Sequence, residues 1–99
     1  MNAITEQLAV LFRAAGKAHH EAYAAVDGAD PDWPLWYTEF LLPKLRPLLN
    51  QTLTRSELVY RLVDVSKRQA ADAPDHDWAS YYAEYFAAAY HITFPDEWG

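Results

Sequence analysis

Apolar residues recur along this chain every three to four positions, which is the period of an amphipathic helix, and the alternation typical of strands is absent. At 100° per residue, one stripe of the first periodic segment consists of Ile4, Leu8, Phe12, Ala15, His19, Ala22 and Val26. Asp27-Gly28 follows, and glycine readily takes the left-handed conformation that ends helices. We therefore predict a first helix over residues 4–26. Gly16 within it costs about 1 kcal/mol relative to alanine, and a close helix crossing would explain its presence.

A second helix is predicted to start near the first of two tryptophan-rich segments. Asp30 or Asp32 can cap its free backbone N–H groups, and proline is tolerated in a first turn because its missing donor would be unpaired there. One face then carries Trp33, Trp36, Tyr37 and Phe40. Prolines at 43 and 47 break or kink helices, so we expect a bend or restart near Leu42. The buried surface is expected to continue through Leu45, Leu48 and Leu49.

Two further helices are predicted in the second half of the chain. Thr54 and Glu57 have the spacing of a capping box, and the helix that follows is expected to end near residue 72. Its stripe consists of Leu58, Leu62, Val65 and Gln69. The fourth helix begins at Asp75 or Asp77 and ends before Pro95. Its predicted face consists of Trp78, Tyr81, Tyr82, Tyr85, Ala89 and Ile92. We expect the aromatic tail, residues 94–98, to fold back on the body or onto a neighbour.

The two tryptophan-rich segments are similar to each other. Residues 30–41 read DPDWPLWYTEFL and residues 75–86 read DHDWASYYAEYF, so five of the twelve positions are identical. We interpret this as an internal repeat that covers roughly residues 4–49 and 54–93. The fold predicted for the single domain, residues 1–99, is an all-α four-helix bundle built from two similar helical hairpins. The alternative is chance similarity, because helix starts favour Asp and helix stripes favour aromatic residues.

Composition narrows the classes of function. The chain has no cysteine, which excludes a disulfide scaffold, a zinc ribbon and thiol catalysis. Its net charge is −6 with only eight Lys and Arg residues, which argues against nucleic-acid binding, because phosphates are bound by neutralising their charge. No apolar stretch approaches the roughly 20 residues of a membrane span, and no secretory signal is visible. We therefore expect a cytoplasmic protein that binds neither nucleic acid nor membrane.

His19 is the strongest candidate for a functional role, because it and Gln69 place polar groups on stripes that need only apolar ones. One interpretation is a hydrogen-bonded core histidine that fixes the register of the helices. The other is a polar spot in a small pocket between the hairpins. The ligand-binding residues predicted on this second interpretation are His19, Trp33, Trp36, Tyr37, Gln69, Trp78 and Tyr82.

Other chemistry finds less support in the sequence. The run His19-His20-Glu21 suggests a metal site, but neighbouring side chains on a helix point about 100° apart, so we predict no metal and no cofactor. Glu39 and Glu84 occupy equivalent places in the two segments, on the border or wet side of their helices. No Gly-x-Ser-x-Gly elbow and no glycine-rich phosphate loop occurs. We predict no catalytic residues, with His19 as a general base the remaining alternative.

The stretch from His19 to Tyr37, with its HHEAY and GADPDWPLWY motifs, resembles a motif of short, uncharacterised bacterial proteins of helical type. The resemblance covers about a fifth of the chain. It implies a bacterial cytoplasmic protein and contributes no catalytic residues.

The surplus of aromatic residues, 15% of the chain, favours a contact surface. Val59 and Val63 also favour a contact surface, because they lie 100° and 140° around the helix from Leu58 and one buried stripe cannot easily cover them. We therefore predict a non-enzymatic module that self-associates, as a homodimer, or docks on another protein. The alternative is a protein that binds a small apolar or aromatic molecule near His19, between the hairpins.

Overall fold

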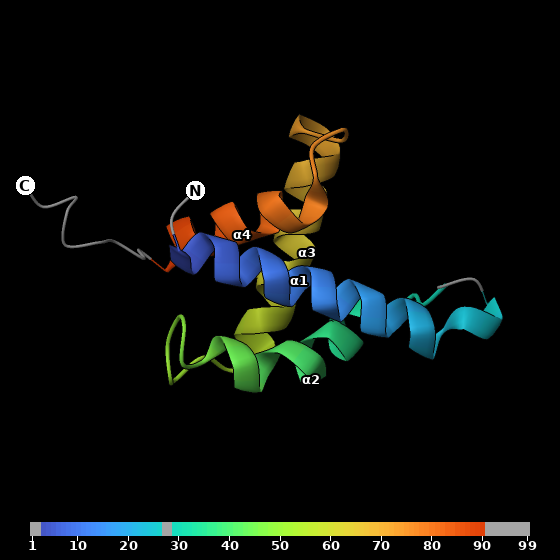
Figure 1. Cartoon of the computed structure of the whole chain (residues 1–99), viewed down its shortest axis with the longest axis horizontal. Helices are drawn as coiled ribbons and strands as arrows, with labels where there is room; N and C mark the ends of the chain where they lie inside the picture. Colours follow the sequence, from blue (N-terminus) through green and yellow to red (C-terminus); the bar gives the residue numbers. More distant parts are fainter. Residues whose placement is uncertain (1–2, 27–28, 91–99) are drawn as a thin grey trace, which may run out of the picture.

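The computed structural model describes residues 3–26 and 29–90, and all regular structure within these ranges is helical (Figure 1). Its elements are α1 (Ala3–Ala22), the 3-10 turn η1 (Ala24–Val26), α2 (Trp33–Leu45), α3 (Arg55–Asp72) and α4 (Trp78–Ala89). The predicted all-α four-helix bundle is confirmed. The predicted stop at Asp27-Gly28, Ile92 of the fourth stripe and the aromatic tail lie outside the described residues.

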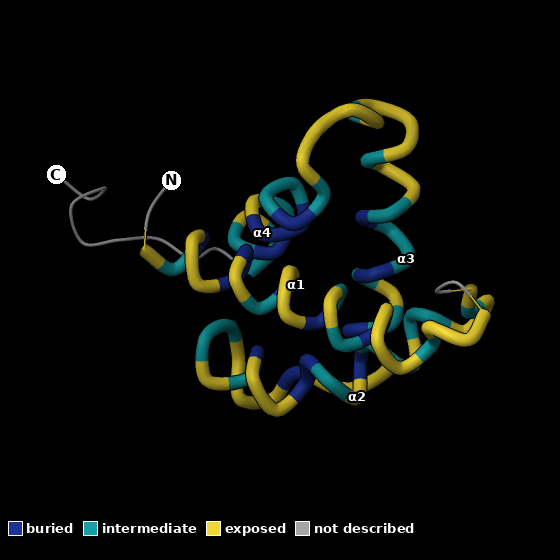
Figure 2. Tube along the Cα trace, turned by 45° about the vertical axis from the view of Figure 1, so that its right-hand side comes forward, coloured by how far each residue is buried: buried dark blue, intermediate teal, exposed yellow. Residues whose placement is uncertain are grey.

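The four helices surround a common interior. In Figure 1, α2 and α4 lie on opposite sides of α1, and α3 runs across behind α1 from the α2 side to the α4 side. Both α1 and α3 therefore pack against both α2 and α4. Buried positions lie on the helix faces turned toward the interior (Figure 2). The largest buried side chains are Phe12, Phe86, Leu8, Leu41, Leu45, Leu53, Leu58, Leu62, Val65 and Thr38.

The stripe predicted for α1 is buried over most of its length. It fails at its end, where Ala22 is exposed and Val26 is 55% exposed. The α-helix stops at Ala22 and a 3-10 turn follows, so the 100° spacing no longer applies to Val26.

Both tryptophan-rich segments open a helix at their tryptophan. Trp33 is the first residue of α2 and Trp78 the first of α4. The Asp77 carboxylate caps α4 by accepting a hydrogen bond from the Ser80 N–H at 3.2 Å, as predicted. Asp32 occupies the equivalent position before α2 and makes no side-chain cap bond.

The predicted restart near Leu42 is wrong, because α2 continues through Pro43 to Leu45. Pro43 lies two residues before the end of the helix, where its missing N–H removes a hydrogen bond only from the last turn. Leu48 and Leu49 continue the apolar surface in the turn that follows, as predicted.

The start of α3 agrees with the prediction only in part. Thr54 accepts a hydrogen bond from the Glu57 N–H at 3.1 Å, as a capping box requires. The Glu57 carboxylate accepts a hydrogen bond from the hydroxyl of Tyr90, the residue that follows α4. This contact links the first turn of α3 to the end of α4.

The buried face of α4 is rotated by one residue from the predicted one. Ala79, Tyr82, Ala83 and Phe86 are buried, whereas Trp78, Tyr81 and Tyr85 are only partly buried. Ala79 and Ala83 leave room for the backbone to approach its neighbours, while the partly buried rings of Trp78, Tyr81 and Tyr85 lie at the border of the contact. The predicted face followed the aromatic residues and passed over the two alanines, which is why it was wrong by one residue.

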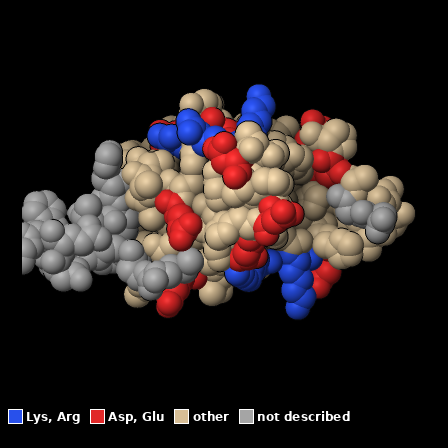
Figure 3. All heavy atoms as spheres, turned by 90° about the horizontal axis from the view of Figure 1, so that it is seen from above, with Lys and Arg blue, Asp and Glu red and all other residues tan. Residues whose placement is uncertain are grey.

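Charged side chains of both signs are interspersed on the surface seen in Figure 3. Arg55 and Glu39 form an ion pair of 2.9 Å between α3 and α2, and Arg13 of α1 pairs with Asp77 at the start of α4. Among the described residues, no helix combines the length and the apolar character that crossing a membrane requires.

Candidate functional site

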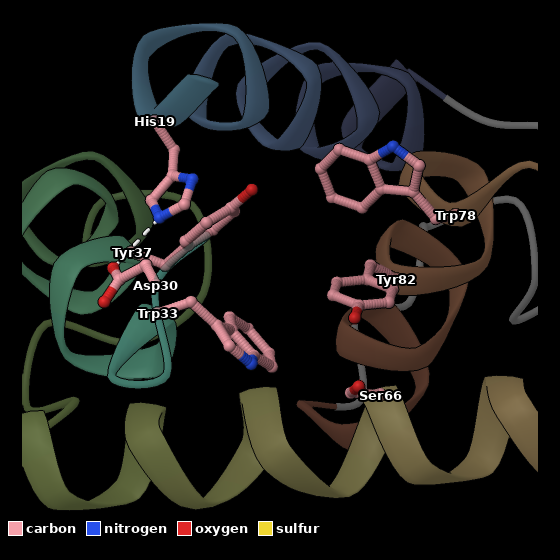
Figure 4. A pocket seen from close by; sticks show the side chains of 7 residues that line it. All are labelled: His19, Asp30, Trp33, Tyr37, Ser66, Trp78 and Tyr82. Carbon is pink, nitrogen blue, oxygen red and sulfur yellow. Dashed lines mark hydrogen bonds and ion pairs between the residues drawn. The ribbon is translucent and has the colours of Figure 1, made fainter. Parts of the chain in front are cut away.

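A cavity of about 340 Å³ lies where the four helices converge (Figure 4). Every helix contributes to its wall, and so does the loop between η1 and α2. Its lining side chains are His19, Asp30, Trp33, Tyr37, Ser66, Trp78 and Tyr82. The site therefore forms only in the folded bundle, since no two adjacent helices hold all of these residues.

The polar centre of the wall is a buried pair. The His19 Nε2 lies 3.0 Å from the Asp30 Oδ2, and the two side chains are 9% and 7% exposed. An ionised carboxylate only accepts hydrogen bonds, so Nε2 carries the proton and donates it. The Asp30 Oδ1 accepts a second hydrogen bond, of 3.0 Å, from the Asp32 N–H. These two bonds fix the carboxylate and the imidazole relative to each other.

The second ring nitrogen of His19, Nδ1, makes no hydrogen bond within residues 3–26 and 29–90. In the neutral imidazole this nitrogen is an acceptor. Figure 4 shows it on the side of the ring turned away from Asp30 and toward Trp78. The pair thus leaves one acceptor for a further hydrogen bond.

Aromatic rings form most of the remaining wall, and they contact one another edge to face. Ring centroids lie 5.4 Å apart for Trp33 and Tyr37, 6.5 Å for Tyr37 and Trp78, and 5.2 Å for Trp78 and Tyr82. Such pairs contribute about 0.5–1.5 kcal/mol beyond the area they bury. The contacts connect α2 to α4 across the site and hold the rings in place.

The tyrosine hydroxyls of the cavity stay protonated. Burial raises the pKa of Tyr37, and the neighbouring Tyr82 raises it further. Burial also raises the pKa of Tyr82, opposed by a hydrogen bond with Ser66. Partial burial and the Asp30 carboxylate raise the pKa of Tyr23, whose ring stacks on His19 at 4.7 Å. Each hydroxyl can therefore donate a hydrogen bond at neutral pH.

Gly16 allows Trp78 to reach the cavity. A Cβ at position 16 would lie 2.8 Å from Cζ2 of the Trp78 indole, which is closer than such atoms approach in proteins. The sequence predicted a close helix crossing at this glycine, but the groups that lie against it are the side chains of Trp78 and Tyr37. Any larger residue at position 16 would displace the indole that walls the site.

Of the seven residues predicted to bind a ligand, the cavity brings together His19, Trp33, Tyr37, Trp78 and Tyr82. Trp36 and Gln69 do not line it. Trp36 stacks on Phe40 at 5.7 Å and meets the His19 ring edge-on at 5.1 Å. Gln69 donates a hydrogen bond of 2.9 Å to the backbone carbonyl of His76.

Asp30 and Ser66 belong to the site but were absent from the sequence prediction. The position of Asp30 before α2 predicts a helix cap, whereas its contact with His19 is a tertiary one across a turn. Ser66 follows the buried Val65 and lies at the edge of the α3 stripe, where a serine carries no signal in sequence.

The geometry does not assemble a nucleophile with a base. The Ser66 hydroxyl is engaged with Tyr82, and Figure 4 shows it across the cavity from His19. A serine hydrolase needs the hydroxyl within hydrogen-bond reach of the imidazole. Within the part of the chain that the structure describes, Asp30 therefore orients the His19 imidazole but no Ser or Thr hydroxyl of the cavity wall is placed for activation by it.

The other predicted candidates lie on the surface. His20 and Glu21 are exposed, and no cluster of three His, Cys, Asp or Glu side chains suited to a metal occurs among the described residues. Glu39 and Glu84 are exposed on different helices, as predicted, and the hydrogen bond from Arg55 lowers the pKa of Glu39.

Comparisons of the chain with protein-family models, curated proteins and solved structures find no match.

Proposed function

We propose that this protein binds a small molecule in the cavity between its four helices. One observation supports the proposal above others: a buried His–Asp pair and four aromatic side chains surround a hollow at the centre of the bundle. Buried polar groups weaken a core that hydrophobic packing alone could form. A chain of 99 residues has little stability to lose in this way. Binding of a ligand would explain why the core contains these polar groups.

The dimensions and chemistry of the cavity suit a ligand with one ring or a similar bulk. Its volume of about 340 Å³ lies at the lower end of the range of roughly 300–1,000 Å³ for ligand pockets. The indoles and phenols supply apolar surface. The His19 Nδ1 and the hydroxyls of Tyr37 and Tyr82 supply the few polar groups that orient a ligand in such a site.

Free indole is a suitable neutral probe of this function. Its binding can be followed by NMR through the side-chain N–H signals of the tryptophans in ¹⁵N-labelled protein. We expect titration with indole to shift the signals of Trp33 and Trp78, which line the cavity, more than the signal of Trp36, which does not. Ser66→Leu should abolish the shifts, because the added side chain occupies the α3 wall. Ser56→Leu is the matched control, since Ser56 is exposed on the same helix.

Two results would contradict this function. One is the absence of any shift with indole in the protein as it stands. The other is equal binding by the Ser66→Leu and Ser56→Leu variants, which would place the probe elsewhere on the molecule.

A second candidate function is self-association or docking of another protein, as the sequence predicted. It is favoured by a groove of about 650 Å³ between the start of α1 and the end of α2, beside which Val10 is 64% exposed. Exposed apolar side chains mark contact surfaces only when they form a patch, and Leu35 and Tyr60 lie on other helices. This observation is weaker than the cavity. The homodimer, the bacterial origin, the cytoplasmic location and the internal repeat stay predictions.

Light scattering at several concentrations tests self-association. We expect the mass to rise from monomer to dimer with concentration if the groove is an interface, and Val10→Glu to reverse the rise. A strict monomer at high concentration removes this candidate and leaves the small-molecule proposal intact.

A further inference from the structure

We propose that the ligand of the cavity is a small organic cation, an alkylated ammonium group whose positive charge faces the rings and Asp30. This inference rests on the proposed function, and it adds the charge and class of the ligand. Three independent features of the wall point to it: the density of aromatic rings, the buried carboxylate, and the absence of Lys and Arg from the lining.

The aromatic rings are the first feature. Trp33, Tyr37, Trp78 and Tyr82 surround the cavity from two sides, as Figure 4 shows. The face of an aromatic ring carries partial negative charge and attracts a cation within about 6 Å of its centre, with tryptophan the strongest of the three ring types. Sites that recognise quaternary ammonium groups use several such rings around one charge. Two indoles and two phenols around about 340 Å³ match that requirement.

The buried carboxylate is the second feature. The Asp30 side chain is 7% exposed, and its Oδ2 lies 3.0 Å from the Nε2 of His19. Asp30 is the only carboxylate among the seven lining residues, so it is the acidic group of the wall. Hydrogen bonds with His19 and the Asp32 N–H stabilise the carboxylate in the free protein, and a positive charge in the cavity would add a favourable Coulomb interaction with it. A cationic ligand supplies that charge, whereas an anionic ligand would be repelled.

The distribution of cations in the protein is the third feature. None of the seven lining residues is Lys or Arg, and the chain as a whole has a net charge of −6. Arg13 and Lys17 of α1 border a separate hollow of about 450 Å³ that shares His19, Tyr37 and Trp78 with the cavity. Arg13 is already paired with Asp77 and also donates to the Ser80 hydroxyl. The cavity itself therefore offers a positive ligand no competing charge.

The test compares two probes of the same shape. Choline carries a quaternary nitrogen, and 3,3-dimethylbutan-1-ol has a carbon in its place and no charge. We expect calorimetry to show that choline binds about tenfold more tightly or better than the alcohol. We also expect choline to shift the NMR signals of the Trp33 and Trp78 side-chain N–H groups in the intact chain.

Variants identify the groups responsible. Asp30→Asn removes the charge and keeps the size, so it should weaken choline binding about tenfold and leave the alcohol unaffected. Trp33→Phe keeps a ring at the site and should retain choline binding, whereas Trp33→Leu should lose most of it. If Asp30→Asn does not fold, the comparison of the two probes on the unaltered chain still decides the question.

The outcomes separate this inference from the proposed function. Equal or tighter binding of the alcohol overturns the cationic ligand, while the cavity remains a binding site. Binding of indole without binding of choline would likewise overturn the cationic ligand and leave the cavity as a binding site. If indole, choline and the alcohol all fail to bind, both proposals are wrong.

Discussion

Replacement of Phe12 by alanine is expected to lower the free energy of unfolding by about 3–5 kcal/mol. The Phe12 side chain is completely buried, and its ring lies 5.6 Å from Tyr82 and 5.2 Å from Phe86, centroid to centroid. The substitution removes the ring that joins α1 to α4 and leaves a void that the bundle fills only in part. Domains of this kind have a total stability of about 5–15 kcal/mol, so the variant would lose a large part of it.

Urea denaturation followed by circular dichroism measures this loss. Val10→Ala is the matched control, because Val10 lies two residues earlier on the same helix and is 64% exposed. We expect that control to change the stability by no more than about 0.5 kcal/mol. If Phe12→Ala cost less than about 1 kcal/mol, the interior between α1 and α4 would not be the centre of the core.

The fold was predictable from sequence because helix period and helix caps are local properties. Leu8, Phe12 and Ala15 recur at helical spacing and are all completely buried, and Thr54 caps α3 as its spacing with Glu57 indicated. The hydrophobic period does not predict how deeply each residue within a stripe is buried. On α4, the buried face combines two alanines with Tyr82 and Phe86, so a stripe chosen for its aromatic residues pointed one residue away from it.

The cavity was predictable in its aromatic part for a similar reason. Tyr37 lies 40° from Trp33 around α2, and both face the interior. Trp36 lies 60° from Trp33 on the opposite side, which is enough to turn its indole away from the cavity onto Phe40. A difference of this size is smaller than the width of an apolar stripe, so the sequence could not separate the two rings.

Gln69 and Asp30 show why the polar part of the site was harder to predict. Gln69 has the helical spacing of a core position, but it lies near the end of α3 and its amide binds the backbone carbonyl of His76. Asp30 has the position of a helix cap, and only the turn of the chain after α1 brings it to His19. Both outcomes depend on where a loop runs in space, which hydrophobic period does not encode.

Replacement of His19 by leucine is expected to cost about 2–4 kcal/mol of stability, although leucine is the more apolar residue. Leucine fills the space of the imidazole but donates no hydrogen bond, so the Asp30 carboxylate, 7% exposed, loses the bond that His19 supplies. His20→Leu is the matched control: the same substitution one residue along, at an exposed position, should change the stability by no more than about 0.5 kcal/mol. Urea denaturation of the two variants at neutral pH gives the comparison.

The Asp30→Asn variant then decides why the pair is retained. If the pair exists to stabilise the fold, Asp30→Asn should lower the stability, because a charged hydrogen bond becomes a neutral one. If the carboxylate is held for a ligand, its removal should leave the free protein as stable or more stable, since functional groups buried at binding sites often reduce stability. We expect the second result, together with choline binding that is about tenfold weaker. Equal stability of His19→Leu and His20→Leu would contradict the expected cost of about 2–4 kcal/mol, because it would mean that the Asp30 carboxylate loses nothing when His19 is replaced.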